Sequence, residues 1–155
     1  MSDAEPQRRL LAENRRARHD FEFLDTLECG LALQGTEVKS LRQGRASIAE
    51  SFALIRAGEL WLINSHIPEY SHGNLHNHVP TRDRRLLAHK RQVRAWDKRV
   101  REQGVTIVPL ELYFRGSLVK ITVALAKGRK QYDKRERERE RTDRRDIERA
   151  MSRRR

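Results

Sequence analysis

Several ingredients of common protein classes are scarce in this chain of 155 residues. Its one cysteine, Cys29, excludes an internal disulfide and any zinc cluster built on cysteines. No stretch approaches the roughly 20 apolar residues that a membrane-spanning helix needs, and residues 1–10 lack the apolar segment of a signal peptide. We therefore expect a soluble cytoplasmic protein of one domain, without a membrane partner.

Common catalytic signatures are also missing. The chain has no P-loop, no dinucleotide-binding glycine fingerprint and no Gly-x-Ser-x-Gly elbow. His72, His76 and His78 share one segment, but their spacing matches neither a helical metal-binding pair nor a zinc finger. We expect no catalytic residues, no metal and no cofactor. A small nuclease that uses these histidines is the minority hypothesis.

Positive charge is what the chain has in excess. There are 34 lysines and arginines against 22 acidic residues, which gives a net charge of +12. Residues 82–101 hold nine basic and two acidic residues, and residues 127–155 hold fourteen basic and seven acidic ones. These two segments carry the whole surplus. Ordinary solvated surface charge is spread more evenly, so the distribution favours two surfaces that bind the phosphates of a nucleic acid.

Short apolar segments separated by turn signals predict a mainly β domain. Residues 51–56 and 59–63 flank Ala57-Gly58, which is typical of a β-hairpin. Strands are also expected over residues 21–33, 106–114 and 118–126, the last with apolar residues at every odd position from 119 to 125. We expect an antiparallel β-barrel like the oligonucleotide-binding architecture, with attached α-helices and a basic C-terminal tail. The pattern leaves other small barrels open.

Two helices and one long loop complete the expected domain. A short helix is predicted from residue 36 to Gly44. The clearer helix covers residues 83–103, because Leu86, Val93, Trp96 and Val100 fall on one stripe and most of the arginines lie off it. Residues 67–81, with two prolines and a glycine, predict a loop.

The two ends of the chain differ from its middle. Residues 1–13 are polar and are expected to form a flexible N-terminal arm, followed by an RNA-binding barrel domain over residues 14–130. Residues 131–155 have Glu/Arg pairs at helical spacing but no substantial apolar face with which to pack on the domain. We predict that this tail is disordered in the free protein and helical on an anionic surface.

Five motifs in this sequence resemble those of the SsrA-binding protein family, also called small protein B. They are Asn14-Arg-Arg-Ala-Arg-His-Asp, Gly35-Thr-Glu-Val-Lys-Ser-Leu-Arg-Gln-Gly, Gly73-Asn-Leu-His-Asn-His, Leu86-Leu-Ala-His-Lys and Ala126-Lys-Gly-Arg-Lys-Gln-Tyr-Asp-Lys-Arg. The resemblance implies a non-catalytic ribosome-rescue factor that binds the tRNA-like domain of transfer-messenger RNA (SsrA RNA). Such a factor stands in for the anticodon arm and delivers the RNA to stalled ribosomes for trans-translation.

The resemblance further implies that the tail becomes helical on the ribosome. There it would sense the empty mRNA channel near the decoding centre of the small subunit. We expect one monomer per RNA. The alternative hypothesis is a constitutive ribosome-associated or assembly protein that binds RNA.

The resemblance also implies roles for individual residues. We expect RNA contacts from Asn14, Arg15, Arg16, Arg18, His19, Glu28, Leu87, Lys120, Lys127, Arg129 and Lys130. We expect ribosome contacts in the tail from Tyr132, Asp133, Lys134 and Arg135. Tyr132 suits either stacking on a base or packing at the domain edge. Because an acidic RNA contact is unusual, Glu28 either accepts a hydrogen bond from the RNA or orients a neighbouring arginine.

Overall fold

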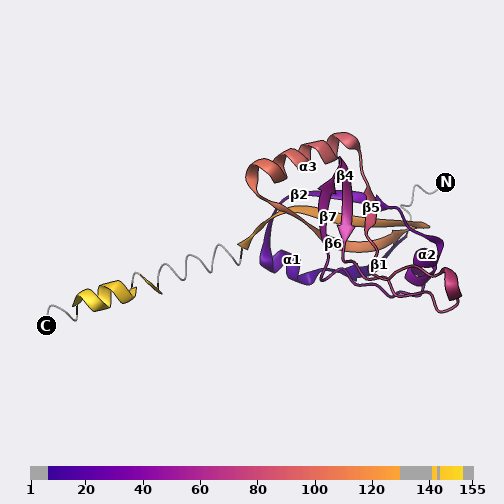
Figure 1. The fold of residues 1–155 in the computed structure, drawn as a ribbon, viewed down its shortest axis with the longest axis horizontal. Coiled ribbons are helices and arrows are strands. Elements are labelled where there is room, and N and C mark those ends of the chain that lie inside the picture. The colour runs from indigo at the N-terminus through magenta and orange to yellow at the C-terminus, as the bar shows by residue number, and fades with distance from the viewer. Residues whose placement is uncertain (1–6, 130–140, 143, 152–155) are drawn as a thin grey trace.

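A closed antiparallel sheet forms the body of the protein in the computed structural model, which describes residues 7–129, 141–142 and 144–151 (Figure 1). The strands are β1 (Arg8–Glu13), β2 (Phe21–Leu31), β3 (Phe52–Arg56), β4 (Glu59–Ile63), β5 (Arg84–Leu87), β6 (Thr106–Arg115) and β7 (Leu118–Gly128). Their order is β1-β6-β3-β4-β5-β2-β7, and β6 also pairs with β7, so six strands close a ring to which β1 is added along β6. The expected mainly β, antiparallel barrel fold is confirmed.

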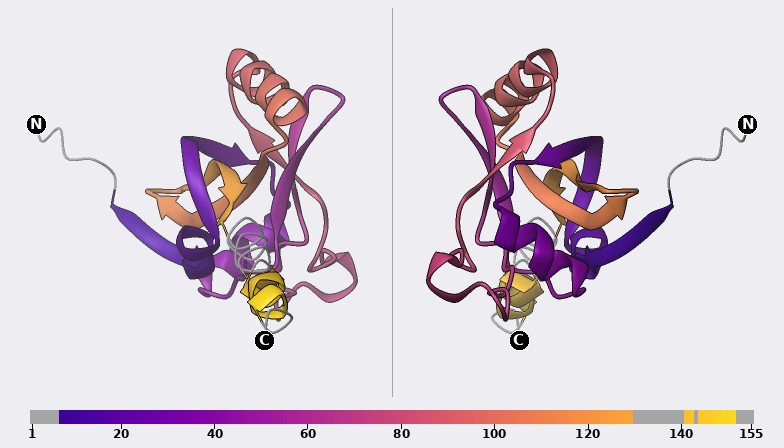
Figure 2. Two further views of the ribbon diagram at one scale, coloured as in Figure 1. Left: turned by 90° about the vertical axis from the view of Figure 1, so that its left-hand side faces the viewer. Right: turned by 90° about the vertical axis from the view of Figure 1, so that its right-hand side faces the viewer.

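The helices lie outside this ring. They are α1 (Arg15–Asp20), α2 (Gly35–Arg42) and α3 (Lys90–Gln103), with a 3₁₀ turn, η1 (Asn74–His76), in the long loop. Figures 1 and 2 place α1 and α3 on opposite sides of the barrel. Among the described residues, no helix has both the length and the hydropathy needed to cross a membrane.

The hairpin predicted over residues 51–63 is confirmed. In the turn between β3 and β4, Ala57 and Gly58 both have positive φ, at 52° and 76°. Two successive left-handed residues match the right-handed twist of the flanking strands, which is why such two-residue loops favour glycine. The turn between β6 and β7 also has a glycine with positive φ, Gly116 at 60°.

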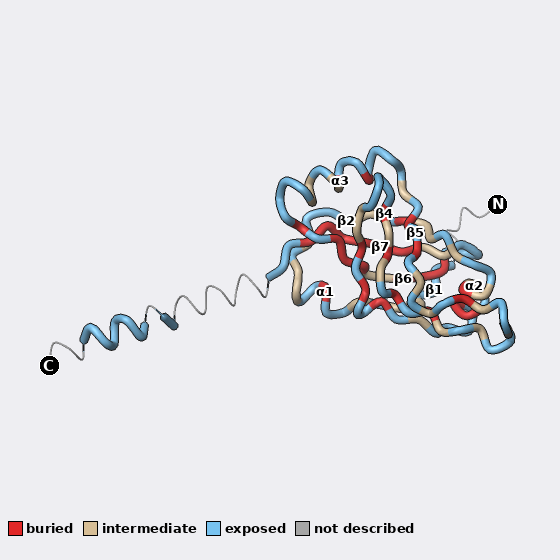
Figure 3. The backbone as a smooth tube through the Cα atoms, in the orientation of Figure 1, coloured by how far each residue is buried: buried red, intermediate tan, exposed pale blue. Residues whose placement is uncertain are grey.

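Alternation along β7 divides its side chains between two apolar clusters. Ile121, Val123 and Leu125 point into the main core with the inward residues of β6. On the other face, Ala124 and Ala126 pack under Ala17 of α1 in a second cluster. Figure 3 shows the buried residues gathered in the sheet and in α2, whereas α3 is mostly exposed. Because α1 covers only part of this outer face, the same face stays open toward Lys120.

The helix predicted over residues 83–103 is wrong in its first part. Arg84–Leu87 forms β5, which pairs with β4 on one side and β2 on the other. Arg84 and Leu86 are buried and alternate with the exposed Arg85 and Leu87, so the period is two rather than 3.6. The helix α3 begins only at Lys90 and ends, as expected, at Gly104 with φ 60°.

The flexible arm predicted over residues 1–13 is also wrong where the structure describes it. Arg8–Glu13 forms β1, whose register with β6 runs from Arg8 opposite Arg115 to Glu13 opposite Glu111. Leu11 and Ala12 are partly buried against the main core, and this apolar contact holds the strand on the barrel.

A buried ion pair joins α2 to β5. Glu37 and Arg84 are both fully buried, and Arg84 Nε donates to Glu37 Oε2 at 2.5 Å. Arg82 donates to the other carboxylate oxygen at 2.6 Å, and the backbone N–H of Gln34 donates to it at 2.7 Å. Burial by itself raises the pKa of Glu37, but the hydrogen bonds from Arg82 and Gln34 and the charge of Arg84 outweigh it and lower the pKa.

The remaining Arg84 donors hold two other segments. One guanidinium nitrogen donates to the backbone oxygen and hydroxyl of Ser65 at 3.1 and 2.9 Å, and another donates to the Pro80 carbonyl at 3.0 Å. The long loop is thus anchored at its end by a residue that the helical stripe would leave in solvent.

In the tail, residues 141–142 and 144–151 are helical and exposed. Lys130 and the four residues predicted for ribosome binding, Tyr132, Asp133, Lys134 and Arg135, lie outside the described residues.

Candidate RNA-binding surface

The first motif is held on the sheet by Asn14. Its backbone N–H donates to the Leu110 carbonyl at 2.8 Å, and its side-chain amide donates to the Pro109 carbonyl at 3.1 Å. Asn14, predicted to contact RNA, therefore has its amide engaged with the backbone of β6. Together with the buried Ala17 it fixes α1 so that Arg15 and Arg18 are exposed.

Two adjoining hollows lie between α1 and the sheet. The first, of about 300 Å³, is lined by Arg15 and Arg18 of α1 with Thr26, Glu111 and Thr122 among the strand residues. The second, of about 550 Å³, again includes Arg18 and Thr26 and extends to Arg129. The structure thus brings Arg129 near Arg18 of α1, although the two lie far apart in the sequence.

The other basic residues predicted in this region are exposed but do not line these two hollows. Arg16 lines a different hollow, beside Glu50 and Phe52. His19 and Lys127 are exposed.

A row of paired residues crosses four strands of the sheet. Leu87 of β5 is opposite Gly30 of β2, Gly30 is opposite Lys120 of β7, and Lys120 is opposite Tyr113 of β6. Residues directly opposite each other in neighbouring strands point to the same face. Leu87 is 45% exposed and Lys120 is partly exposed, so the register places these two predicted RNA contacts on one surface.

Glu28 lies beside this row and holds two residues of β6. The Tyr113 hydroxyl donates to Glu28 Oε2, and Arg115 Nη1 donates to Glu28 Oε1 at 2.8 Å. Burial, followed by the hydrogen bond to Glu28, raises the pKa of Tyr113. Of the two roles considered for Glu28, this geometry supports the orientation of a neighbouring arginine.

Arg8 completes this group from β1. Its guanidinium carbon lies 4.2 Å from the centre of the Tyr113 ring, a cation–π distance. It also forms an ion pair with Glu111. Tyr113, Arg8 and Arg115 were absent from the sequence-based candidates, because only the β1–β6–β7–β2 register shows that they adjoin Glu28 and Lys120.

The histidines of the long loop are not gathered. His78 is buried, with Nδ1 2.9 Å from the Thr36 hydroxyl and Nε2 2.9 Å from the Ile67 carbonyl. His72 instead packs edge-on against the ring of Tyr70. Within the part of the chain that the structure describes, no three histidine, cysteine or acidic side chains are grouped as a metal site would require. His78 therefore joins α2 to the loop.

Residues 11–153 match a protein-family model described as SmpB protein. The chain belongs to the SmpB family. Two similar relatives are SsrA-binding proteins: the protein from Kineococcus radiotolerans is 53% identical over 148 residues, which cover 96% of this chain and 95% of the relative. The protein from Thermobifida fusca is 54% identical over 145 residues, which cover 94% of this chain and 91% of the relative.

A solved structure described as "tmRNA-SmpB: a journey to the center of the bacterial ribosome" contains a chain similar to this SmpB family member. The identity is 48%, the TM-score is 0.62, and the match covers 75% of this chain and 82% of the other. This likeness supports the same overall architecture for the two chains.

Proposed function

We propose that this protein binds the tRNA-like domain of transfer-messenger RNA and delivers it to stalled ribosomes for trans-translation. The barrel substitutes for an anticodon arm, and the tail senses the empty mRNA channel at the decoding centre. The observation that carries this proposal is the surface formed by Leu87, Lys120 and Glu28, which the strand register assembles from three strands. The protein's membership of the SmpB family supports transfer-messenger RNA as the RNA that is bound.

The protein acts in this scheme by shape and charge, with no covalent chemistry of its own. Folded RNA is recognised mainly through its shape and backbone, and a rigid sheet with fixed arginines suits that recognition. The charge beside the open face of the sheet comes from Arg15, Arg18 and Arg129. Further RNA contacts in this scheme come from Arg16, His19, Lys127 and Lys130. The tail residues Tyr132, Asp133, Lys134 and Arg135 contact the ribosome. We place this activity in the cytoplasm, with one monomer for each RNA.

Affinity purification of the full-length protein from cells tests the proposal. We expect a discrete, structured RNA to co-purify and to contain the tRNA-like domain. We also expect enrichment on ribosomes stalled on mRNA without a stop codon. An equal amount of protein on translating and stalled ribosomes, with no such RNA, would contradict the proposal and favour the constitutive ribosome-associated protein.

The role of Glu28 makes a second prediction. Because Glu28 fixes Arg115 and the Tyr113 hydroxyl, Glu28→Ala is expected to weaken binding of the tRNA-like domain on the order of 10-fold, or about 1.4 kcal/mol. Filter binding measures the dissociation constant, and thermal unfolding checks that the barrel is intact. Glu102→Ala, which removes an exposed acidic residue from α3, is the matched control and should leave the affinity unchanged.

A double-mutant cycle separates positioning from direct contact. If Glu28 acts by orienting Arg115, Arg115→Ala should weaken binding, and adding Glu28→Ala should cost little more. Independent, additive losses would show instead that Glu28 contacts the RNA directly.

A further inference from the structure

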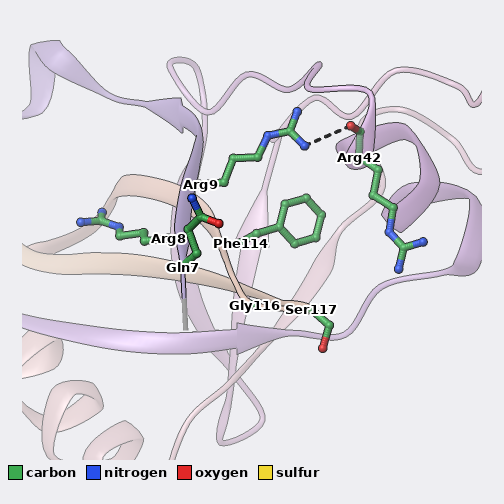
Figure 4. Close-up of a pocket in the computed structure, with 7 residues that line it drawn as sticks. All are labelled: Gln7, Arg8, Arg9, Arg42, Phe114, Gly116 and Ser117. Atoms are coloured by element: carbon green, nitrogen blue, oxygen red, sulfur yellow. Dashed lines mark hydrogen bonds between the residues drawn. The ribbon is translucent and has the colours of Figure 1, made fainter. Parts of the chain in front are cut away.

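A basic hollow lies at the end of the barrel, outside the surface formed by Glu28, Leu87 and Lys120. It is lined by Gln7, Arg8, Arg9, Arg42, Phe114, Gly116 and Ser117 and has a volume of about 600 Å³ (Figure 4). Three segments distant in the sequence meet there: the start of β1, the end of α2 and the turn between β6 and β7. The backbone N–H of Gly116 donates to the Gln7 carbonyl at 3.1 Å and joins two of them.

The positive charge of this hollow is only partly neutralised. Arg8 is paired with Glu111. Among the residues that the structure describes, Arg9 and Arg42 have no acidic partner. By contrast, Arg84 and Arg115 on nearby strands are each paired with a glutamate. Two unneutralised guanidinium groups in one hollow favour an anionic ligand.

Arg9 is exposed and makes one hydrogen bond to the backbone. Its Nη1 donates to the Arg42 carbonyl at the end of α2 at 3.3 Å, and in Figure 4 its guanidinium extends over the hollow toward that carbonyl. The ring of Phe114, 7% exposed, lies between the two arginines and forms an apolar wall. A guanidinium that is oriented by such a bond loses less conformational freedom on binding a phosphate than an unrestrained one, and the apolar wall beside it strengthens the electrostatic attraction.

Arg8 connects this hollow to the candidate RNA-binding surface. It lines the hollow and at the same time lies over the ring of Tyr113, whose hydroxyl donates to Glu28. An RNA that contacts Lys120 and Glu28 therefore reaches the hollow by continuing past the Arg8 side chain.

We propose that Arg9 and Arg42 bind a phosphodiester segment of the same RNA that occupies the Glu28 and Lys120 surface. This inference rests on the proposed function, since it takes that RNA to be transfer-messenger RNA. Guanidinium groups donate two parallel hydrogen bonds to phosphate oxygens, and the Ser117 hydroxyl at the rim supplies a further donor. The hollow thereby extends the RNA contact from the side of the barrel to its end.

The test is the salt dependence of RNA binding by the full-length double variant Arg9→Gln/Arg42→Gln. The logarithm of the association constant falls linearly with the logarithm of the salt concentration, and removing one phosphate-binding cation reduces the steepness of this fall by about 1. The double variant should therefore reduce it by about 2. Its dissociation constant for the tRNA-like domain at moderate salt should rise on the order of 10-fold or more. Thermal unfolding shows whether the variant remains folded.

Two controls accompany this variant. Arg9→Lys/Arg42→Lys keeps both charges and should retain the wild-type slope. Arg144→Gln/Arg145→Gln removes two charges from exposed helical residues in the tail and should also retain it.

An unchanged slope in the folded Arg9→Gln/Arg42→Gln variant would overturn the inference. If that variant binds the tRNA-like domain normally but binds ribosomes without transfer-messenger RNA more weakly, the hollow serves ribosomal RNA and the inference is also wrong. Failure of the proposed function would look different, because the wild-type protein itself would not bind the tRNA-like domain.

Discussion

Deleting residues 131–155 is expected to abolish peptide tagging on stalled ribosomes and to leave capture of transfer-messenger RNA nearly intact. The deleted segment holds eleven basic and seven acidic residues, whereas Glu28, Lys120 and the basic hollow all belong to the barrel. A segment that acts in the empty mRNA channel of the ribosome contributes after RNA capture. Mobility shift with the tRNA-like domain and a tagging assay on stalled ribosomes measure the two activities separately.

A single substitution distinguishes loss of the tail's charge from loss of its helix. Ile147 lies within the helical residues 144–151 and is 56% exposed. Ile147→Pro keeps every charge but costs about 3 kcal/mol in a helix interior, whereas alanine is the best helix former. We expect Ile147→Pro to lower tagging and Ile147→Ala to retain it. If the deletion also abolishes RNA capture, the division between barrel and tail is incorrect.

Glu37→Gln is expected to destabilise the barrel by about 3–5 kcal/mol. The substitution removes the carboxylate that faces both Arg84 and Arg82, and it leaves the fully buried Arg84 charge without a counter-ion. Urea unfolding followed by circular dichroism measures this loss. The matched control is Arg85→Met on the same strand: Arg85 pairs with Glu59 at 3.5 Å, and both side chains are almost half exposed. Such a surface pair contributes about 0–1 kcal/mol.

The same pair gives the stability a defined dependence on pH. The pKa of Glu37 is lowered below its ordinary value of 4.5 in the folded protein. Its contribution is therefore fully present above the unfolded pKa and is lost as the pH falls through the folded one. The difference in unfolding free energy between the wild type and Glu37→Gln should shrink as the pH falls below this value. A difference that stays constant down to strongly acidic pH would mean that the Glu37 carboxylate does not carry the effect.

Local patterns predicted those parts of the fold in which neighbours in sequence are neighbours in space. The hairpin around Ala57 and Gly58 needs only a two-residue turn between apolar strands. The period of two in β7 correctly separated its inward side chains, although α1 also buries Ala124 and Ala126 on the outer face.

The failures arose where distant pairing overrides a local pattern. Leu86 has the spacing of a helical stripe with Val93. In the structure, however, it pairs with both β4 and β2 as part of the strand that closes the ring. Arg84 resembled a solvent-facing residue because its partner Glu37 lies 47 positions away. For the same reason the family resemblance identified Glu28 and Lys120, but not Tyr113, Arg8 and Arg115, which adjoin them only after folding.

The arginines of β1 also protect the protein from self-association. Of the described strands, β1 pairs with β6 alone, so its outer edge offers unpaired backbone groups to any strand that approaches. Exposed edges of this kind template aggregation unless charge or irregularity blocks them. Arg8 and Arg9 place two like charges on this short edge, and a register shift between Leu10 and Ala12 interrupts its regularity. A second copy approaching edge to edge would bring arginine against arginine, which disfavours pairing of two barrels along this strand.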